Sequence, residues 1–354
     1  MLGDITKVNR LHSQLRGYNP EELVYITWNF TTTCNFKCSY CPDDLHNGKY
    51  GFPKYDKALN FFRILSKQLP KKCYITIELL GGEPTMWPKL IDFVAEVRKV
   101  FYGTEQKIVI MLDTNLSRTN RWFEKLKEKK LWDIVIINAS YHADFCDPDL
   151  FYSNLKIISS EYKVNANFML DPKHFTKVVT LFDRVRENLP VDIITKVLRP
   201  SLSADFGKLI DGYTEEMLKY ISDYHKHDFE YDRSKYNFVP GDRVGWPLEL
   251  YGDGKKIHWE LILIKKQHNL KGWNCSAGSR RLFIEPTGDI YPCAQLPNYF
   301  INEDGSVKPN YNKDHNWHQG NINNDDFQIY KNYITCPADW CPCKMDTVCD
   351  KTKN

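Results

Sequence analysis

The sequence predicts an α/β fold, a partial TIM-like (β/α)6 barrel followed by a smaller C-terminal β-hairpin domain. Apolar, strand-like runs alternate with amphipathic, helix-like runs through about the first 200 residues, which is the pattern of βα units around a parallel sheet. With 354 residues, 42% of them hydrophobic, the chain can bury one large core and a smaller one. We expect four regions: an N-terminal extension (1–22), the barrel (23–200), a bridging segment (201–273) and a C-terminal domain (274–354).

The barrel elements follow from local patterns. Asp171 and Pro172 form a typical helix start, because aspartate caps a helix N-terminus and proline fits its first turn. Strands are predicted at residues 24–30, 73–80, 107–113, 133–140, 163–170 and 192–198. Helices are predicted at residues 55–69, 88–101, 121–129, 148–161, 173–188 and 214–227.

Three cysteines directly follow the first predicted strand. Cys34, Cys38 and Cys41 form a CxxxCxxC run. Three thiolates on one short loop can hold three irons of a [4Fe–4S] cluster and leave the fourth iron open. Zinc is the alternative, but a structural zinc site needs four ligands, and His46 is the nearby residue that could complete one.

The cysteine run resembles the signature of the radical SAM superfamily, including the aromatic Tyr40 before the third cysteine. After the second strand, Gly81-Gly82-Glu83-Pro84 resembles the GGEP motif of that superfamily. The resemblance implies a partial barrel, an open iron that binds S-adenosylmethionine (SAM), and a 5′-deoxyadenosyl radical formed when the cluster is reduced. It also implies that Tyr40, Gly81, Gly82 and Glu83 belong to the SAM site.

Polar side chains near the C-terminal ends of the later strands are further candidates, because functional groups gather there in barrels of parallel strands. We predict that Asn115, Ser140, Asn167 and Arg199 contact SAM, although each could instead satisfy nearby backbone groups. Cys146 follows the fourth strand and could donate a hydrogen atom to a substrate radical, as in some radical SAM epimerases. The alternative for Cys146 is a small buried hydrophobic residue.

Six cysteines lie in the C-terminal third. Cys275 and Cys293 flank a hairpin signal with Gly288 in its turn. This Cx12Gx4C spacing, together with Gly320-Asn321-Ile322, resembles SPASM and twitch domains, which carry auxiliary [4Fe–4S] clusters. Six cysteines exceed the four that one cluster needs and fall short of two full sets, so we expect one twitch-like cluster. Its predicted ligands are Cys275, Cys293, Cys341 and Cys343, with Cys336 and Cys349 as alternates.

Two other arrangements of the C-terminal cysteines stay open. A second cluster with one iron that lacks a cysteine ligand is one. A structural zinc is the other, because zinc ribbons with four cysteine ligands use similar hairpins.

Composition indicates where the protein acts and which partners it has. The N-terminus has no apolar signal segment and the sequence has no apolar run of roughly 18 to 20 residues, so we expect a cytoplasmic protein without a membrane span. Eleven cysteines in such a chain indicate metal or cluster ligands rather than disulfides. The net charge of +3, without a dense basic stripe, argues against nucleic acid as a partner.

The resemblance implies an enzyme that cleaves SAM reductively and abstracts a hydrogen atom from its substrate, with electrons from a donor such as flavodoxin or ferredoxin. We expect the substrate to be a peptide that is oxidised, crosslinked or epimerised, because SPASM-like elements most often accompany such maturases. The alternative substrate is a sugar-like small molecule that is dehydrogenated or rearranged. A non-catalytic zinc or iron–sulfur binding module is the alternative of a different class.

Overall fold

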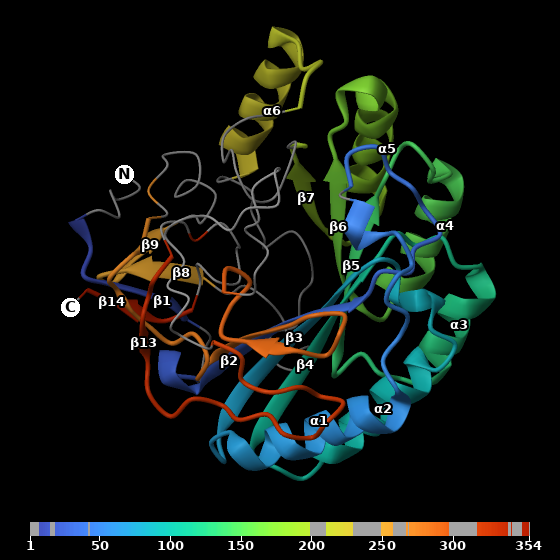
Figure 1. Cartoon of the computed structure of the whole chain (residues 1–354). Helices are drawn as coiled ribbons and strands as arrows, with labels where there is room; N and C mark the ends of the chain where they lie inside the picture. The colour runs from blue at the N-terminus through green and yellow to red at the C-terminus, as the bar shows by residue number, and fades with distance from the viewer. Residues whose placement is uncertain are drawn as a thin grey trace.

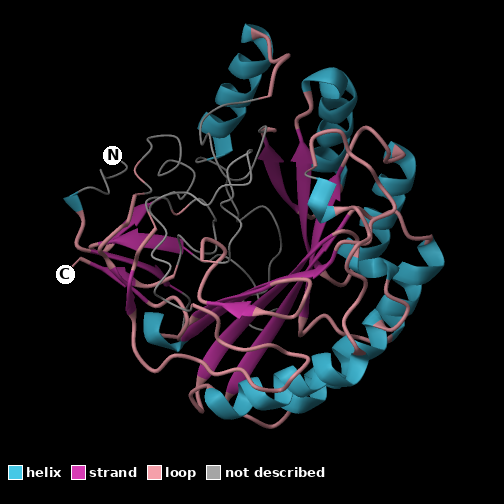
Figure 2. Ribbon diagram, viewed as in Figure 1, coloured by secondary structure: helices cyan, strands magenta, loops and turns pink. Residues whose placement is uncertain are grey.

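The computed structural model describes residues 7–14, 18–41, 43–198, 210–228, 249–257, 267, 269–296, 317–338, 341 and 349–353. Two of the predicted site residues, Arg199 and Cys343, lie outside these ranges. A curved sheet forms the centre of the molecule, and helices cover its outer face (Figures 1 and 2).

The βα alternation predicted from the sequence is confirmed. The six parallel barrel strands are β2 (Leu23–Thr31), β3 (Cys73–Gly81), β4 (Gln106–Thr114), β5 (Val135–Tyr141), β6 (Lys163–Met169) and β7 (Asp192–Lys196). The helices are α1 (Tyr55–Gln68), α2 (Leu90–Phe101), α3 (Asn120–Glu128), α4 (Pro148–Ser159), α5 (Phe175–Asn188) and α6 (Glu215–Asp228). Among the described residues the barrel stays open, because β7 and β12 (Ile290–Tyr291) are the two edges of its sheet.

The two faces of the sheet bury different side chains, since successive residues of a strand point to opposite faces. On the outer face, Ile26, Ile77 and Ile110 belong to the main core beneath the helices. On the inner face, Tyr25 and Met111 belong to a smaller apolar cluster that also contains Cys275 and Cys349. Cys275 and Cys349 therefore lie against the inner face of the barrel sheet.

The start of α5 follows the predicted pattern with one addition. Asp171 caps a short 3-10 helix, Pro172–His174, and its side chain accepts a hydrogen bond from the Lys173 backbone N–H at 3.0 Å. The α-helix then begins at Phe175. This turn brings Asp171 and His174 to the C-terminal end of β6.

The predicted C-terminal hairpin is confirmed, but it is part of the barrel sheet. Strand β11 (Arg281–Ile284) pairs antiparallel with β12 and parallel with β2. The sheet order is therefore β12-β11-β2-β3-β4-β5-β6-β7. The hairpin extends the barrel on the side of the first strand, next to the segment that leads into Cys34.

A second, six-stranded sheet joins three distant parts of the chain. Its order is β13 (Ile334–Thr335), β10 (Asn274–Cys275), β14 (Lys351–Thr352), β1 (Arg10–Gln14), β8 (Glu249–Gly252) and β9 (Lys255–Ile257). The N-terminal strand β1 thus lies between β14, the last strand, and β8 of the bridging segment (Figure 1).

The segment after the hairpin is held on α1. Lys57 of α1 forms an ion pair with Asp325 at 2.5 Å, and the Gln68 side chain donates to the Phe327 carbonyl at 2.9 Å. The rings of Phe61 and Phe327 lie 4.9 Å apart. Within the described ranges, no helix has the length and apolar character that crossing a membrane requires.

Candidate functional site

The cysteine loop and the GGEP motif are joined through their backbones. The Gly82 N–H donates to the Thr31 carbonyl at 2.7 Å, and the Glu83 N–H donates to the Thr33 carbonyl at 2.8 Å. A Cβ atom on Gly81 would lie 2.3 Å from the Thr31 carbonyl oxygen, and one on Gly82 would lie 2.1 Å from that of Thr33. These distances are too short for any side chain, so the two glycines allow the motif to fasten the entrance of the loop.

The Glu83 carboxylate links the GGEP motif to the end of β4. Glu83 is 1% exposed. Its Oε1 accepts hydrogen bonds from the Thr85 N–H and hydroxyl and from the Thr114 hydroxyl, and its Oε2 accepts from the Asn115 N–H. Burial raises the pKa of Glu83, while these donors oppose the shift. Both oxygens are thus engaged by groups of the protein itself.

Asn115 in turn contacts the cysteine loop. Its side-chain amide donates to Asn35 Oδ1 at 3.1 Å, and the Asn35 amide donates to the Ser117 hydroxyl at 2.8 Å. Since Asn35 follows Cys34 directly, the segment after β4 holds the first cysteine of the loop from one side.

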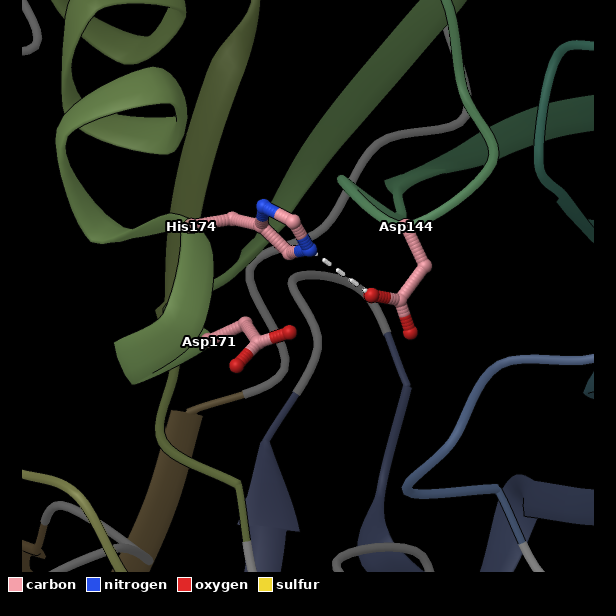
Figure 3. A group of neighbouring side chains, drawn as sticks. All are labelled: Asp144, Asp171 and His174. Carbon is pink, nitrogen blue, oxygen red and sulfur yellow. Dashed lines mark hydrogen bonds and ion pairs between the residues drawn. The ribbon is translucent and has the colours of Figure 1, made fainter.

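The loop after β5 holds the cysteine loop from the other side. Asp144 Oδ2 accepts hydrogen bonds from the Ser39 N–H and hydroxyl, each at 3.2 Å, and its Oδ1 lies 2.9 Å from His174 Nε2. Burial favours the neutral carboxyl of Asp144, but the bonds from Ser39 and His174 outweigh it and lower its pKa. Figure 3 shows the His174 ring directed at Asp144, with Asp171 beside them; the ligand atoms of the three lie within 4.8 Å of one another.

Tyr40 and His142 form a second contact between the same two loops. The Tyr40 hydroxyl lies 2.7 Å from His142 Nδ1, and the two rings are stacked. Burial, and then the charge of Lys196, lowers the pKa of His142 to about 4. The imidazole is therefore neutral near pH 7, and its Nδ1 can accept a hydrogen bond from the Tyr40 hydroxyl.

The three loop cysteines suit a metal cluster. Cys38 is buried, and Cys34 and Cys41 are partly buried. Burial, and then the neighbouring Cys41, raises the pKa of Cys38 to about 12, and burial also raises that of Cys34. Thiols in such a place ionise when a metal cation binds them, because metal ligands must be deprotonated. Three sulfur donors on one loop are the set that a [4Fe–4S] cluster with an open iron needs.

Two of the strand-end candidates, Ser140 and Asn167, share one face of the sheet. Ser140 of β5 and Asn167 of β6 are register partners, so their side chains point the same way. Asn167 is buried and Ser140 partly buried. Cys146 is 3% exposed and belongs to the main core, with its thiol 3.7 Å from the Asn115 carbonyl, and burial raises its pKa to about 12. These surroundings favour the packing alternative for Cys146, and its role as a hydrogen donor stays a prediction.

Sequence reasoning missed a polar layer on the inner face of the barrel. The Thr27 hydroxyl donates to Glu78 Oε2 at 3.2 Å, and the Asn165 amide donates to Asn138 Oδ1 at 2.7 Å. Burial, and then the charge of Glu78, raises the pKa of Asp113 well above its ordinary value. An acidic or amide residue inside an otherwise apolar strand could have indicated this layer, since such residues are rarely buried unless they have a partner.

Four of the C-terminal cysteines that the structure describes gather on the inner side of the barrel. The sulfur atoms of Cys275 and Cys349 lie 3.8 Å apart. Partly buried Cys293 and Cys336 pack against the same apolar cluster, whereas Cys341 belongs to a different one. Cys349, predicted only as an alternate ligand, is therefore brought directly beside Cys275. This pair of neighbouring, buried thiols fits an auxiliary cluster.

Two family models match the chain. The model of the radical SAM superfamily matches residues 28–197. The SPASM model, described as an iron–sulfur cluster-binding domain, matches residues 275–332. The matches contain the cysteine loop and the GGEP motif in the first case, and Cys275 and Cys293 in the second.

The chain is also similar to curated proteins and to solved structures. The chain is 25% identical over 217 residues to a GTP 3′,8-cyclase of Clostridium perfringens, which is 56% of this chain and 62% of that protein. It is 26% identical over 155 residues to a GTP 3′,8-cyclase of Helicobacter pylori, which is 42% of this chain and 46% of that protein. Thus the chain spans less than two thirds of these relatives. The solved structure of native anSMEcpe with bound AdoMet and Kp18Cys peptide shares the fold, with a TM-score of 0.51, 18% identity and coverage of 84% of this chain and 77% of that chain.

Proposed function

Because this chain belongs to the radical SAM superfamily and carries a C-terminal SPASM iron–sulfur domain, we propose that it cleaves SAM reductively and uses the 5′-deoxyadenosyl radical to take a hydrogen atom from a peptide. Its cofactors are a SAM-binding [4Fe–4S] cluster, an auxiliary [4Fe–4S] cluster and SAM. We place it among the oxidoreductase or maturase type of radical SAM enzyme, acting in the cytoplasm with electrons from flavodoxin or ferredoxin.

The arrangement of the cysteine loop carries the catalytic part of this proposal. Cys34, Cys38 and Cys41 would hold the SAM-binding cluster. The loop is fastened by Gly81–Glu83 on one side and by Asp144 on the other, so the three thiols keep one orientation at the end of the barrel. Such preorganisation is the contribution a protein makes when a cofactor supplies the chemistry.

Other residues would bind or orient SAM at this end. Ser140 and Asn167 would present polar groups from adjacent strands, and Asn115 would act from the segment that contacts Asn35. Glu83 would position the motif, because its oxygens accept hydrogen bonds from protein donors. The full proposed SAM set is Tyr40, Gly81, Gly82, Glu83, Asn115, Ser140, Asn167 and Arg199.

The SPASM domain favours a peptide substrate. Domains of this kind most often accompany peptide modification, by oxidation, crosslinking or epimerisation. One solved structure that shares this fold, that of anSMEcpe, contains a bound Kp18Cys peptide. In that protein the peptide is a ligand; for this chain it is a proposal that requires its own test.

A nucleotide is the second candidate. The curated relatives are GTP 3′,8-cyclases, although the identity is 25% and covers 62% of the first of them. The matched SPASM domain keeps the peptide first.

The test of the chemistry is anaerobic reconstitution, followed by iron analysis and by incubation with SAM and dithionite. Two clusters should give about eight irons per chain, and 5′-deoxyadenosine should form. Replacing Cys34, Cys38 and Cys41 with alanine should abolish that product. Cys73→Ala is the matched control, because Cys73 lies in the core on β3. A preparation that binds zinc and cleaves no SAM would contradict the proposal.

The substrate classes are separated by deuterium transfer. Peptides from bacteria grown in D2O should yield deuterated 5′-deoxyadenosine, detected by mass spectrometry, and deuterated GTP should not. Transfer from GTP alone would favour the nucleotide. Transfer from neither would contradict both assignments while leaving SAM cleavage intact.

A further inference from the structure

A lysine is buried among the cysteines of the C-terminal domain. Lys351 of β14 is 1% exposed. It lies between two neighbouring strands, with Leu11 of β1 and Cys275 of β10 as its register partners. Its Nζ donates hydrogen bonds to the Cys349 sulfur at 2.9 Å and to the Cys349 carbonyl at 3.1 Å. A lysine is rarely buried unless a negative group accompanies it.

The adjacent carboxylate is engaged elsewhere. Asp350 accepts hydrogen bonds from Arg10 at 2.9 and 3.0 Å and from the Tyr333 hydroxyl at 2.8 Å. The sulfur atoms of Cys349 and Cys275, which lie 3.8 Å apart beside Lys351, carry negative charge when they are ionised. Burial of an ammonium group away from negative charge is strongly unfavourable, so this position fits an anionic cluster held by these thiolates.

We propose that Lys351 sets the reduction potential of the auxiliary cluster through a hydrogen bond to the sulfur of Cys349, which serves as a cluster ligand. The inference rests on the proposed function, which includes this cluster. Hydrogen bonds to the ligand sulfurs and net charge are two of the factors that fix the potential of an iron–sulfur cluster. Lys351 is a positioning and tuning residue, since it acts through a ligand rather than on the substrate.

The direction of the effect follows from charge. Reduction adds one electron to the cluster; no covalent bond forms or breaks, and no proton is transferred. A fixed positive charge beside the sulfur stabilises the more negative, reduced form, so Lys351 raises the potential. Removing the charge should favour the oxidised form and lower the potential.

The experiment is a redox titration of the reconstituted full chain with dithionite, followed by electron paramagnetic resonance. The variants are Lys351→Met and Lys351→Gln, which remove the charge, and Lys351→Arg, which keeps it. Lys353→Met is the matched control, because Lys353 lies two residues further along and is exposed, where solvent screens its charge. Replacing Cys34, Cys38 and Cys41 with alanine identifies which signal belongs to the auxiliary cluster.

We expect the two neutral variants to raise the ratio of oxidised to reduced auxiliary cluster at least tenfold at a fixed applied potential. This change corresponds to a reduction potential that is lower by about 59 mV for a one-electron couple. Lys351→Arg should shift less, and Lys353→Met and the SAM-binding cluster should not shift. If the neutral variants bind the cluster at the wild-type potential, the inference is overturned. If the neutral variants fail to bind the cluster, Lys351 is needed for assembly of the cluster rather than for its potential, and the inference is overturned.

The inference about Lys351 can be wrong while the proposed function is right, and iron analysis separates the two cases. Four irons in the variant that lacks Cys34, Cys38 and Cys41 would show that the auxiliary cluster exists, whatever its potential. Iron absent from that variant would contradict the auxiliary cluster itself, and with it that part of the proposed function.

Discussion

The Asn115 backbone N–H donates a 2.7 Å hydrogen bond to Glu83 Oε2. This bond joins the loop after β3 to the end of β4, and the Asn115 side chain continues the connection to Asn35 in the cysteine loop. The two sequence motifs are therefore mechanically connected. Changes at Glu83 should be transmitted to the cysteines even though Glu83 is not proposed to bind iron.

Glu83→Gln should weaken this connection. In Glu83→Gln an NH2 group takes the place of one acceptor oxygen and faces other hydrogen-bond donors. We expect this change to lower the free energy of unfolding by about 1 to 3 kcal/mol. Urea unfolding, followed under anaerobic conditions, measures the loss, and iron content should fall with it. Glu96→Gln on the surface of α2 is the control. Equal stability of Glu83→Gln and wild type would show that the carboxylate bonds do not hold the loop.

Gly82→Ala should displace the cysteine loop. The added Cβ would lie 2.1 Å from the Thr33 carbonyl oxygen, so the loop or the strand end must move. We expect about four of the roughly eight irons to be lost, with an unchanged far-ultraviolet circular dichroism spectrum. Gly51→Ala should retain its iron, because a Cβ at Gly51 has no atom within 4 Å. Full iron loading of Gly82→Ala would refute the steric argument.

Asp144→Asn should loosen the same loop from its other side. The variant loses the charge that strengthens the hydrogen bonds from Ser39 and His174, and bonds to charged groups contribute about 1.5 to 3 kcal/mol. A chelator should therefore remove iron from Asp144→Asn several times faster than from wild type. Asp149→Asn, at an exposed ion pair with Arg184, should lose iron at the wild-type rate. Identical rates for the two variants would contradict an anchoring role for Asp144.

Cys349→Ala should remove the auxiliary cluster. Its sulfur lies 3.8 Å from that of Cys275, so we expect iron to fall by about four per chain. Cys73→Ala, which alters the barrel core, should keep both clusters. Retention of about eight irons by Cys349→Ala would show that the ligands are drawn from the other C-terminal cysteines.

Glu285→Gln should reduce the dependence of stability on pH. Burial, and then the charge of Asp289, raises the pKa of Glu285 from 4.5 to about 7. The folded chain thus holds this proton more tightly than the unfolded chain, so the stabilising contribution is present below pH 4.5 and is lost as pH rises through about 7. Urea unfolding at pH 6 and pH 8 should show a smaller drop for Glu285→Gln than for wild type. An equal decrease in the free energy of unfolding for the variant and wild type would show that another group titrates in this range.

Much of the barrel and the first cluster loop could be predicted from the sequence. Strands and helices such as β3 and α1 match their expected positions within one or two residues, because apolar periodicity along a segment reflects which face is buried. The CxxxCxxC loop and the GGEP motif are also local, since each needs only a few consecutive residues. Their order along the chain was sufficient to predict the family.

Only the tertiary structure decided which distant residues meet. The pairing of β11 with β2, the insertion of β1 beside β14, the contact of Cys349 with Cys275 and the burial of Lys351 join segments that lie far apart in the sequence, such as Arg10 and Thr352. Pairing between strands leaves no periodic signal that names the partner, and a lysine looks solvent-exposed until its neighbours are known. The sequence by itself determined the elements and the thiols that we propose for the SAM-binding cluster, and packing determined the surroundings of the C-terminal thiols.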